Sequence, residues 1–125
     1  MNKPLTVYKA SAGSGKTFTL AVEFIKLLVV NPLSYRNILA VTFTNKATEE
    51  MKMRILSQLY GIWKSLPDSQ SYIDKICQST GLSQEMAAKN AGIALSNILH
   101  DYSRFRIETI DSFFQSVVRN LAHEL

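Results

Sequence analysis

The segment at residues 10–17, Ala-Ser-Ala-Gly-Ser-Gly-Lys-Thr, combines the residue types that grip a phosphate chain. Glycines at positions 13 and 15 allow positive-φ backbone and let main-chain N–H groups approach an anion closely. Lys16 adds a positive charge for the β- and γ-phosphates, and the Thr17 hydroxyl is suited to ligating Mg²⁺. The segment therefore predicts a P-loop for a nucleoside triphosphate with Mg²⁺. The nucleotide-binding residues that we predict are Ala10, Ser11, Ala12, Gly13, Ser14, Gly15, Lys16, Thr17 and Phe18, with Lys16 and Thr17 as the catalytic pair.

The segment departs from the common P-loop pattern at one position, because Ala10 stands where the first glycine is expected. The context supports the motif nevertheless. Residues 5–8 read as a buried strand, and Leu20, Phe24 and Leu27 recur at helical spacing after Lys16. The alternative is a glycine-serine turn that happens to lie beside a lysine, and the strand, loop and helix order favours the P-loop.

The composition sets limits on the class of protein. With 125 residues, of which 46% are apolar, the chain can bury one ordinary core, so we expect one domain. The net charge of +4 is compatible with a nucleic-acid partner but does not demonstrate one. The single cysteine, Cys77, rules out an internal disulfide, and we expect it to pack as a small side chain in a reducing, cytoplasmic setting. The sequence has neither a long apolar run nor the pattern of a secretory signal.

The elements around the P-loop predict the beginning of a parallel sheet. We expect strands at residues 5–10 and 37–43, joined by a helix at residues 16–30 that Pro32 prevents from continuing. Residues 38–41 are continuously apolar, as in a strand that is covered on both faces. A strand, a crossover helix and a second strand form a right-handed parallel unit.

Further helices and one more strand follow. Thr44 or Asn45 can cap a helix that runs to about residue 65, and its buried stripe is expected to consist of Met51, Ile55, Leu59 and Ile62. We expect helices near residues 69–79 and 84–101, separated by Gly81, with the second presenting Ala87, Ala91, Ala94, Ile98 and Tyr102 on one face. A strand at residues 104–110, with apolar positions 105, 107 and 110, leads into a last helix from Ser112 whose apolar side is expected to contain Phe113, Phe114, Val117 and Leu121.

Three stretches together resemble a known family. They are residues 10–19, residues 38–51 (Ile-Leu-Ala-Val-Thr-Phe-Thr-Asn-Lys-Ala-Thr-Glu-Glu-Met) and residues 107–114 (Ile-Glu-Thr-Ile-Asp-Ser-Phe-Phe). They resemble superfamily 1 DNA helicases of the UvrD/Rep type, and the first and last stretches are more similar to the RecB/AddA branch of helicase-nuclease subunits. The resemblance implies an α/β fold, a partial RecA-like P-loop NTPase sheet with flanking helices. It divides the chain into core residues 1–65 and 104–125 and a helical insertion at about residues 66–103.

The resemblance also implies a function in the cytoplasm. Such relatives hydrolyse ATP with Mg²⁺ and move along single-stranded DNA or from duplex ends in repair and recombination, in some cases with a second helicase-nuclease subunit. In this chain, the DNA-binding residues that the resemblance implies are Phe43, Thr44, Asn45, Lys46, Thr109 and Ser112. The sequence looks like the beginning of a longer protein, because doubly wound nucleotide domains usually carry more than three strands.

Each DNA-binding candidate also has a purely structural interpretation. Phe43 is expected to stack on a base, and the alternative is an ordinary core phenylalanine at a strand end. Thr44 or Asn45 can simply cap a helix, and Thr109 or Asp111 can cap the last one. Arg104, Arg106 and Arg119 can contact phosphates or remain solvated surface residues. Tyr60, Trp63 and Tyr72 are interpreted as packing residues, and His100 and His123 have no partners at zinc-ligand spacing.

Several parts of the family pattern have no counterpart in this sequence. The acidic Walker B pair, the arginine finger, the upstream glutamine motif and the second lobe are missing, so we expect no ATP turnover from these residues alone. Asp111 stands where UvrD-like members usually carry histidine, which puts a phosphate contact there in doubt. Two other functions remain open: a small P-loop kinase, whose arginine-rich lid is not evident, and a non-catalytic nucleotide-sensing module.

Overall fold

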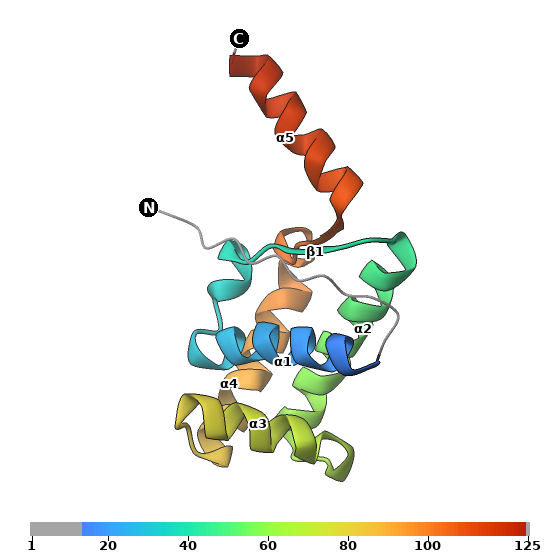
Figure 1. Cartoon of the computed structure of the whole chain (residues 1–125). Helices are drawn as coiled ribbons and strands as arrows, with labels where there is room; N and C mark the ends of the chain where they lie inside the picture. The colour runs from blue at the N-terminus through green and yellow to red at the C-terminus, as the bar shows by residue number, and fades with distance from the viewer. Residues whose placement is uncertain (1–13, 125) are drawn as a thin grey trace.

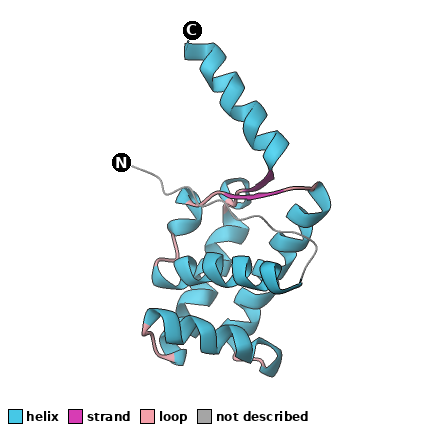
Figure 2. Ribbon diagram, viewed as in Figure 1, coloured by secondary structure: helices cyan, strands magenta, loops and turns pink. Residues whose placement is uncertain are grey.

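The computed structural model describes residues 14–124, with side chains from residue 17 onward. The strand expected at residues 5–10 and the first half of the P-loop lie outside the described residues. In the described part, α-helices α1 to α4 pack together beneath a short strand pair, and α5 extends away from them (Figures 1 and 2). The elements are α1 (Ser14–Val30), η1 (Ser34–Asn37), β1 (Ala40–Thr42), α2 (Asn45–Lys64), η2 (Pro67–Ser69), α3 (Gln70–Thr80), α4 (Gln84–His100), η3 (Tyr102–Arg104), β2 (Ile107–Thr109) and α5 (Ile110–Glu124).

The two described strands are parallel, as a parallel α/β sheet requires. Ala40 pairs with Ile107, Val41 with Glu108 and Thr42 with Thr109. The chain between them contains α2, α3 and α4, so the crossover is helical. The predicted α/β class is therefore confirmed as a small parallel pair within a mostly helical structure, and the complete P-loop sheet stays a prediction.

The ends of the helices follow from local chemistry. The Thr44 hydroxyl accepts a hydrogen bond from the Ala47 N–H at 3.0 Å, which confirms Thr44 as the cap of α2. Gly81 ends α3 with φ of 77°, a left-handed conformation that favours glycine. The end of α1 is stabilised from two other segments, since Asn90 donates to the Val29 carbonyl at 2.6 Å and Ser34 donates to the Leu27 carbonyl at 3.0 Å.

One hydrophobic core joins α1, α2, α3 and α4. The predicted stripe of α2 and the four alanine and isoleucine positions of α4 are buried, as are Ile25 and Leu28 of α1 and Ile73 and Ile76 of α3. The helices at residues 66–103 therefore share this core with the helices of the predicted central part. The division into a core and an insertion stays an interpretation.

The C-terminal part differs from the sequence expectations in four respects. Tyr102 is 45% exposed because α4 ends at His100, before the predicted face reaches it. Ile110 is 38% exposed because it begins α5 and does not extend β2. The last helix starts at Ile110, ahead of the predicted Ser112, and its expected apolar side buries no residue. Figure 1 shows the reason, since α5 points away from the other helices.

No helix in the described part of the chain has the length and apolar content needed to span a membrane.

Candidate nucleotide-binding loop and nucleic-acid interface

The described half of the P-loop is the first turn of α1. Residues 14–17 open this 17-residue helix, and its first turn carries no acidic side chain. The first N–H groups of a helix have no acceptor within the helix, and the helix dipole places positive charge at that end. Figure 1 places the start of α1 and the start of α2 on the same side of the view. Residues 10–13 lie outside the described residues, so the nucleotide contacts of the loop stay predictions.

Phe18 has a packing role in the structure. Its ring is half-buried and lies 4.7 Å from the ring of Tyr72, measured between centroids. Tyr72 itself is only 4% exposed, which confirms its interpretation as a packing residue. The side chain of Phe18 thus packs against the core, and its contact with nucleotide stays a prediction.

The strand register brings the DNA-binding candidates together. Thr42 pairs with Thr109, so the segment that follows β1 and the segment that ends β2 lie at the same carboxyl edge of the strand pair. Phe43 and Lys46 come from the first segment, and Thr109 and Ser112 come from the second. Open α/β sheets bind ligands at this edge. Two groups of residues that are far apart in the sequence therefore form one candidate interface.

Phe43 is exposed at this edge. The strand residues Val41 and Thr42 are 3% and 1% exposed, whereas Phe43 is 51% exposed. The alternative interpretation of Phe43 as a core side chain is therefore wrong for the described structure, because half of its surface reaches solvent. An aromatic ring in this position is available for stacking.

Two helices begin at the same edge. Thr44 caps α2, and the Thr109 hydroxyl accepts a hydrogen bond from the Ser112 N–H at 3.1 Å at the start of α5. Of the two caps proposed for the last helix, the structure selects Thr109, and Asp111 lies exposed in the first turn. Asn45, Lys46 and Ser112 are also exposed. The positive ends of both helix dipoles point to this edge, which favours an anion there.

A buried polar network that the sequence analysis missed supports the turn between β1 and α2. The hydroxyls of Thr42 and Thr48 lie 2.6 Å apart, and both side chains are buried. The Thr42 hydroxyl also contacts the carbonyls of Thr44 at 3.2 Å and Glu108 at 3.4 Å. This network connects β1, α2 and β2 through Thr42, the residue before Phe43. The only signal in the sequence was a threonine in an otherwise apolar strand.

Two of the three arginines that we considered for phosphate contacts are engaged in ion pairs. Arg106 binds Glu108 at 2.8 Å, and Arg104 approaches Asp101 at 3.8 Å. Arg119 is exposed on α5. Arg104 and Arg106 both precede β2, and so they lie on the side of the strands away from the carboxyl edge. Their positions do not add to the candidate interface.

The described residues include no group of three His, Cys, Asp or Glu side chains arranged to hold a metal ion. Cys77 is half-buried on α3 and packs against the core, as expected. Burial raises the pKa of its thiol above the ordinary value, and the nearby Asp74 carboxylate adds to this effect. The thiol is therefore neutral at neutral pH, consistent with a packing role.

The fold is that of an α/β protein with a parallel strand pair, and two capped helix starts and an exposed aromatic ring lie at the carboxyl edge of this pair. A comparison with protein families agrees with this class. The model described as "UvrD/REP helicase N-terminal domain" matches residues 1–125. The chain therefore belongs to the UvrD/REP helicase N-terminal domain family, as the sequence motifs indicated.

Curated relatives fall into both groups that the motifs resembled. "DNA helicase II" of Haemophilus influenzae is 47% identical over 62 residues, which cover 43% of this chain and 8% of that protein. "RecBCD enzyme subunit RecB" of Chlamydia muridarum is 36% identical over 103 residues, which cover 82% of this chain and 10% of the relative. The protein of the same name from Borreliella burgdorferi is 34% identical and covers 86% of this chain and 9% of the relative. The chain thus spans about a tenth of the length of these relatives. No solved structure matches it.

Proposed function

We propose that this chain is the ATP-binding N-terminal segment of an ATP-dependent translocase or helicase that moves along single-stranded DNA in repair or recombination. The observation that carries the proposal is the strand register, which gathers the residues around Phe43 and Thr109 at one edge. Family membership supports it, since relatives are named DNA helicase II and RecB. From the same family membership we propose that the longer protein acts in the cytoplasm and that it works with a second helicase-nuclease subunit.

The start of α1 fits the triphosphate of ATP. Its first turn carries no carboxylate that would repel the phosphates, and its dipole favours negative charge. The residues that would hold ATP are those at positions 10–18, with Lys16 on the terminal phosphates and Thr17 as the Mg²⁺ ligand. Bound ATP supplies the free energy of phosphoryl transfer to the longer protein. We expect no turnover by these residues alone, because they lack the acidic Walker B pair and the arginine finger of the family.

The carboxyl edge of the strand pair fits a single nucleic-acid strand. The exposed ring of Phe43 offers a stacking surface for a base of any sequence. The start of α2, with Asn45 and Lys46, and the start of α5, with Ser112, offer N–H groups and a positive charge for backbone phosphates. These groups read no base edge, so the expected binding is independent of sequence.

Calorimetry with ATP and Mg²⁺ tests the nucleotide half of the proposal. Lys16→Ala should lower the affinity at least about tenfold, because a hydrogen bond to a charged group contributes roughly 1.5–3 kcal/mol. Lys26→Ala is the matched control, since Lys26 lies on the same helix and pairs with Glu23 at 2.7 Å. An affinity that is unchanged by Lys16→Ala would remove the assignment of the P-loop.

A further inference from the structure

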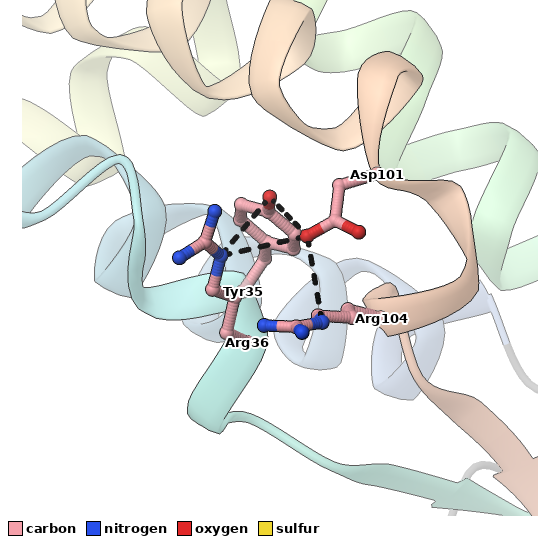
Figure 3. Close-up of polar contacts among 4 residues, drawn as sticks. All are labelled: Tyr35, Arg36, Asp101 and Arg104. Atoms are coloured by element: carbon pink, nitrogen blue, oxygen red, sulfur yellow. Dashed lines mark hydrogen bonds and ion pairs between the residues drawn. The ribbon is translucent and has the colours of Figure 1, made fainter.

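A cluster of four side chains connects the segments that precede the two strands (Figure 3). The Tyr35 hydroxyl donates a hydrogen bond to Asp101 Oδ2 at 2.9 Å, across 66 positions of sequence. The Nε atoms of Arg36 and Arg104 lie 3.4 Å and 3.8 Å from the same oxygen. Tyr35 and Arg36 belong to η1, which precedes β1, whereas Asp101 and Arg104 lie just before β2. The cluster therefore connects the two segments that lead into the parallel pair.

The bond between Tyr35 and Asp101 is the central contact of the cluster. Tyr35 is only 1% exposed, so its hydroxyl depends on Asp101 in place of water. The side chains of Arg36 and Arg104 are 46% and 62% exposed, and ion pairs at such positions contribute little to stability. The pKa of Arg36 is raised, first by its hydrogen bond to Tyr35, and Arg36 stays charged.

The strands are short, so few backbone hydrogen bonds contribute to their alignment. Each contains three residues, and three residue pairs define the register. A slip by one residue would turn every side chain of a strand to its opposite face. At the carboxyl end, the Thr42 hydroxyl contacts the Glu108 carbonyl at 3.4 Å. At the amino end, the corresponding connection is the contact between Tyr35 and Asp101.

We propose that Tyr35 and Asp101 are positioning residues for the candidate DNA interface: they hold the register that places Phe43 beside Thr109. Neither residue lies at the carboxyl edge, so both act through the strands. The part that concerns DNA rests on the proposed function. The part that concerns the register stands independently of it.

Amide hydrogen exchange in Tyr35→Phe, followed by NMR, tests the register. The variant keeps the buried ring and removes only the hydroxyl. The Ala40 N–H, which donates to the Arg106 carbonyl at 3.2 Å, should exchange about tenfold faster, as expected for the loss of one buried hydrogen bond. Amides within α2 and α4 should keep their exchange rates. Unchanged exchange at Ala40, or equal acceleration throughout the protein, would overturn the proposal.

Arg104→Gln is the matched control, since it removes a peripheral ion pair and leaves the contact between Tyr35 and Asp101 in place. It should leave exchange at Ala40 unchanged. An acceleration as large as that of Tyr35→Phe would assign the connection to the ion pairs and would overturn the proposal as stated.

A double-mutant cycle tests the link to DNA. The affinity for single-stranded DNA should fall in Tyr35→Phe and in Phe43→Ala, and the double variant should be no weaker than Phe43→Ala alone. Additive losses would overturn the positioning role. If the unmodified chain does not bind DNA, the proposed function fails, and the exchange measurement still decides the question of the register.

Discussion

Burial changes sharply between two neighbouring residues, Thr42 and Phe43, at the end of β1. Thr42, the last residue of β1, is 1% exposed, and Phe43 directly after it is 51% exposed. The buried hydroxyls of Thr42 and Thr48 fix the backbone at this point. Half of the surface of Phe43 reaches solvent directly after this fixed point, which leaves the ring available for stacking.

Phe43→Ala should weaken the binding of single-stranded DNA by about 5- to 150-fold, because stacking on an aromatic side chain contributes about 1–3 kcal/mol per base. Fluorescence anisotropy with oligonucleotides of two different sequences measures this loss, which should be equal for both. Tyr60→Ala is the control, since Tyr60 is an exposed aromatic residue near the other end of α2.

Lys46→Ala separates the effect of charge from that of stacking. It should lower the slope of the DNA affinity against salt concentration, on logarithmic scales, by about one unit. Binding that is unaffected in both Phe43→Ala and Lys46→Ala would contradict the interface.

The candidate site could be predicted at residue level only where local chemistry determines it. The sequence offered two candidate caps for each helix, Thr44 or Asn45 and Thr109 or Asp111, and in the structure the threonine caps the helix in both cases. Tyr35 gave no signal, because it lies between Pro32 and the strand without periodic apolar neighbours. Its partner Asp101 is 66 positions away, and no local pattern encodes such a distant contact.

At the scale of elements, the helices were predictable to within about two residues at each end, whereas both described strands were predicted in the right place but too long. Pro32, Gly81 and the threonine caps define helix ends through backbone conformation, which is local. The strand expected at residues 37–43 is reduced to Ala40–Thr42, because a strand extends only as far as its partner does. Tyr60 and Trp63 were expected to pack, and they are 47% and 43% exposed. Trp63 nevertheless lies against Gly92 of α4, and the rings of Tyr60 and Trp63 lie 5.9 Å apart, measured between centroids.

The contact between α2 and α4 depends on a glycine. A side chain at Gly92 would place its Cβ 2.6 Å from Cδ1 of Trp63, so the indole lies where only a glycine leaves room. We expect Gly92→Ala to lower the free energy of unfolding by about 1 kcal/mol, because overpacking outweighs the better helix propensity of alanine. In the Trp63→Ala background, the same substitution should instead stabilise the protein by roughly 0.5–1 kcal/mol, since only the propensity remains.

Urea denaturation of the four proteins in this cycle measures both effects. A reversal of sign between the two backgrounds is the expected result. If Gly92→Ala has the same effect with and without Trp63, the indole does not determine the residue at this position.

At the scale of the whole molecule, α5 differs from the other four helices. It contains no buried residue, and Phe114 and Leu121 are 65% and 58% exposed. Its amphipathic pattern predicted a helix correctly but could not predict its surroundings, because a pattern identifies an apolar face and not the surface that covers it. Family membership was predictable from three short motifs that together occupy less than half of the sequence.

Limited proteolysis should remove the end of α5 first. Trypsin is expected to cut after Arg119 before it cuts within α2 or α4, because local unfolding of a helix without buried side chains costs the least free energy. Mass spectrometry identifies the first product. The free energy of unfolding of this product should be lower than that of the uncut chain by less than about 0.5 kcal/mol, the range that is usual for substitutions at the surface. A first cut within α2 or α4 would show that α5 is not the least stable helix.

The separation of the paired strands has a consequence for biosynthesis. Ala40 and its partner Ile107 are 67 positions apart. At the roughly 5–20 residues per second of translation, β1 is made about 3–13 seconds before β2 exists. Helices α2, α3 and α4 are synthesised within that interval, and their local contacts form in far less time. The three helices can therefore pack before β2 is made. During that interval the edge of β1 that later pairs with β2 is open to pairing with other chains.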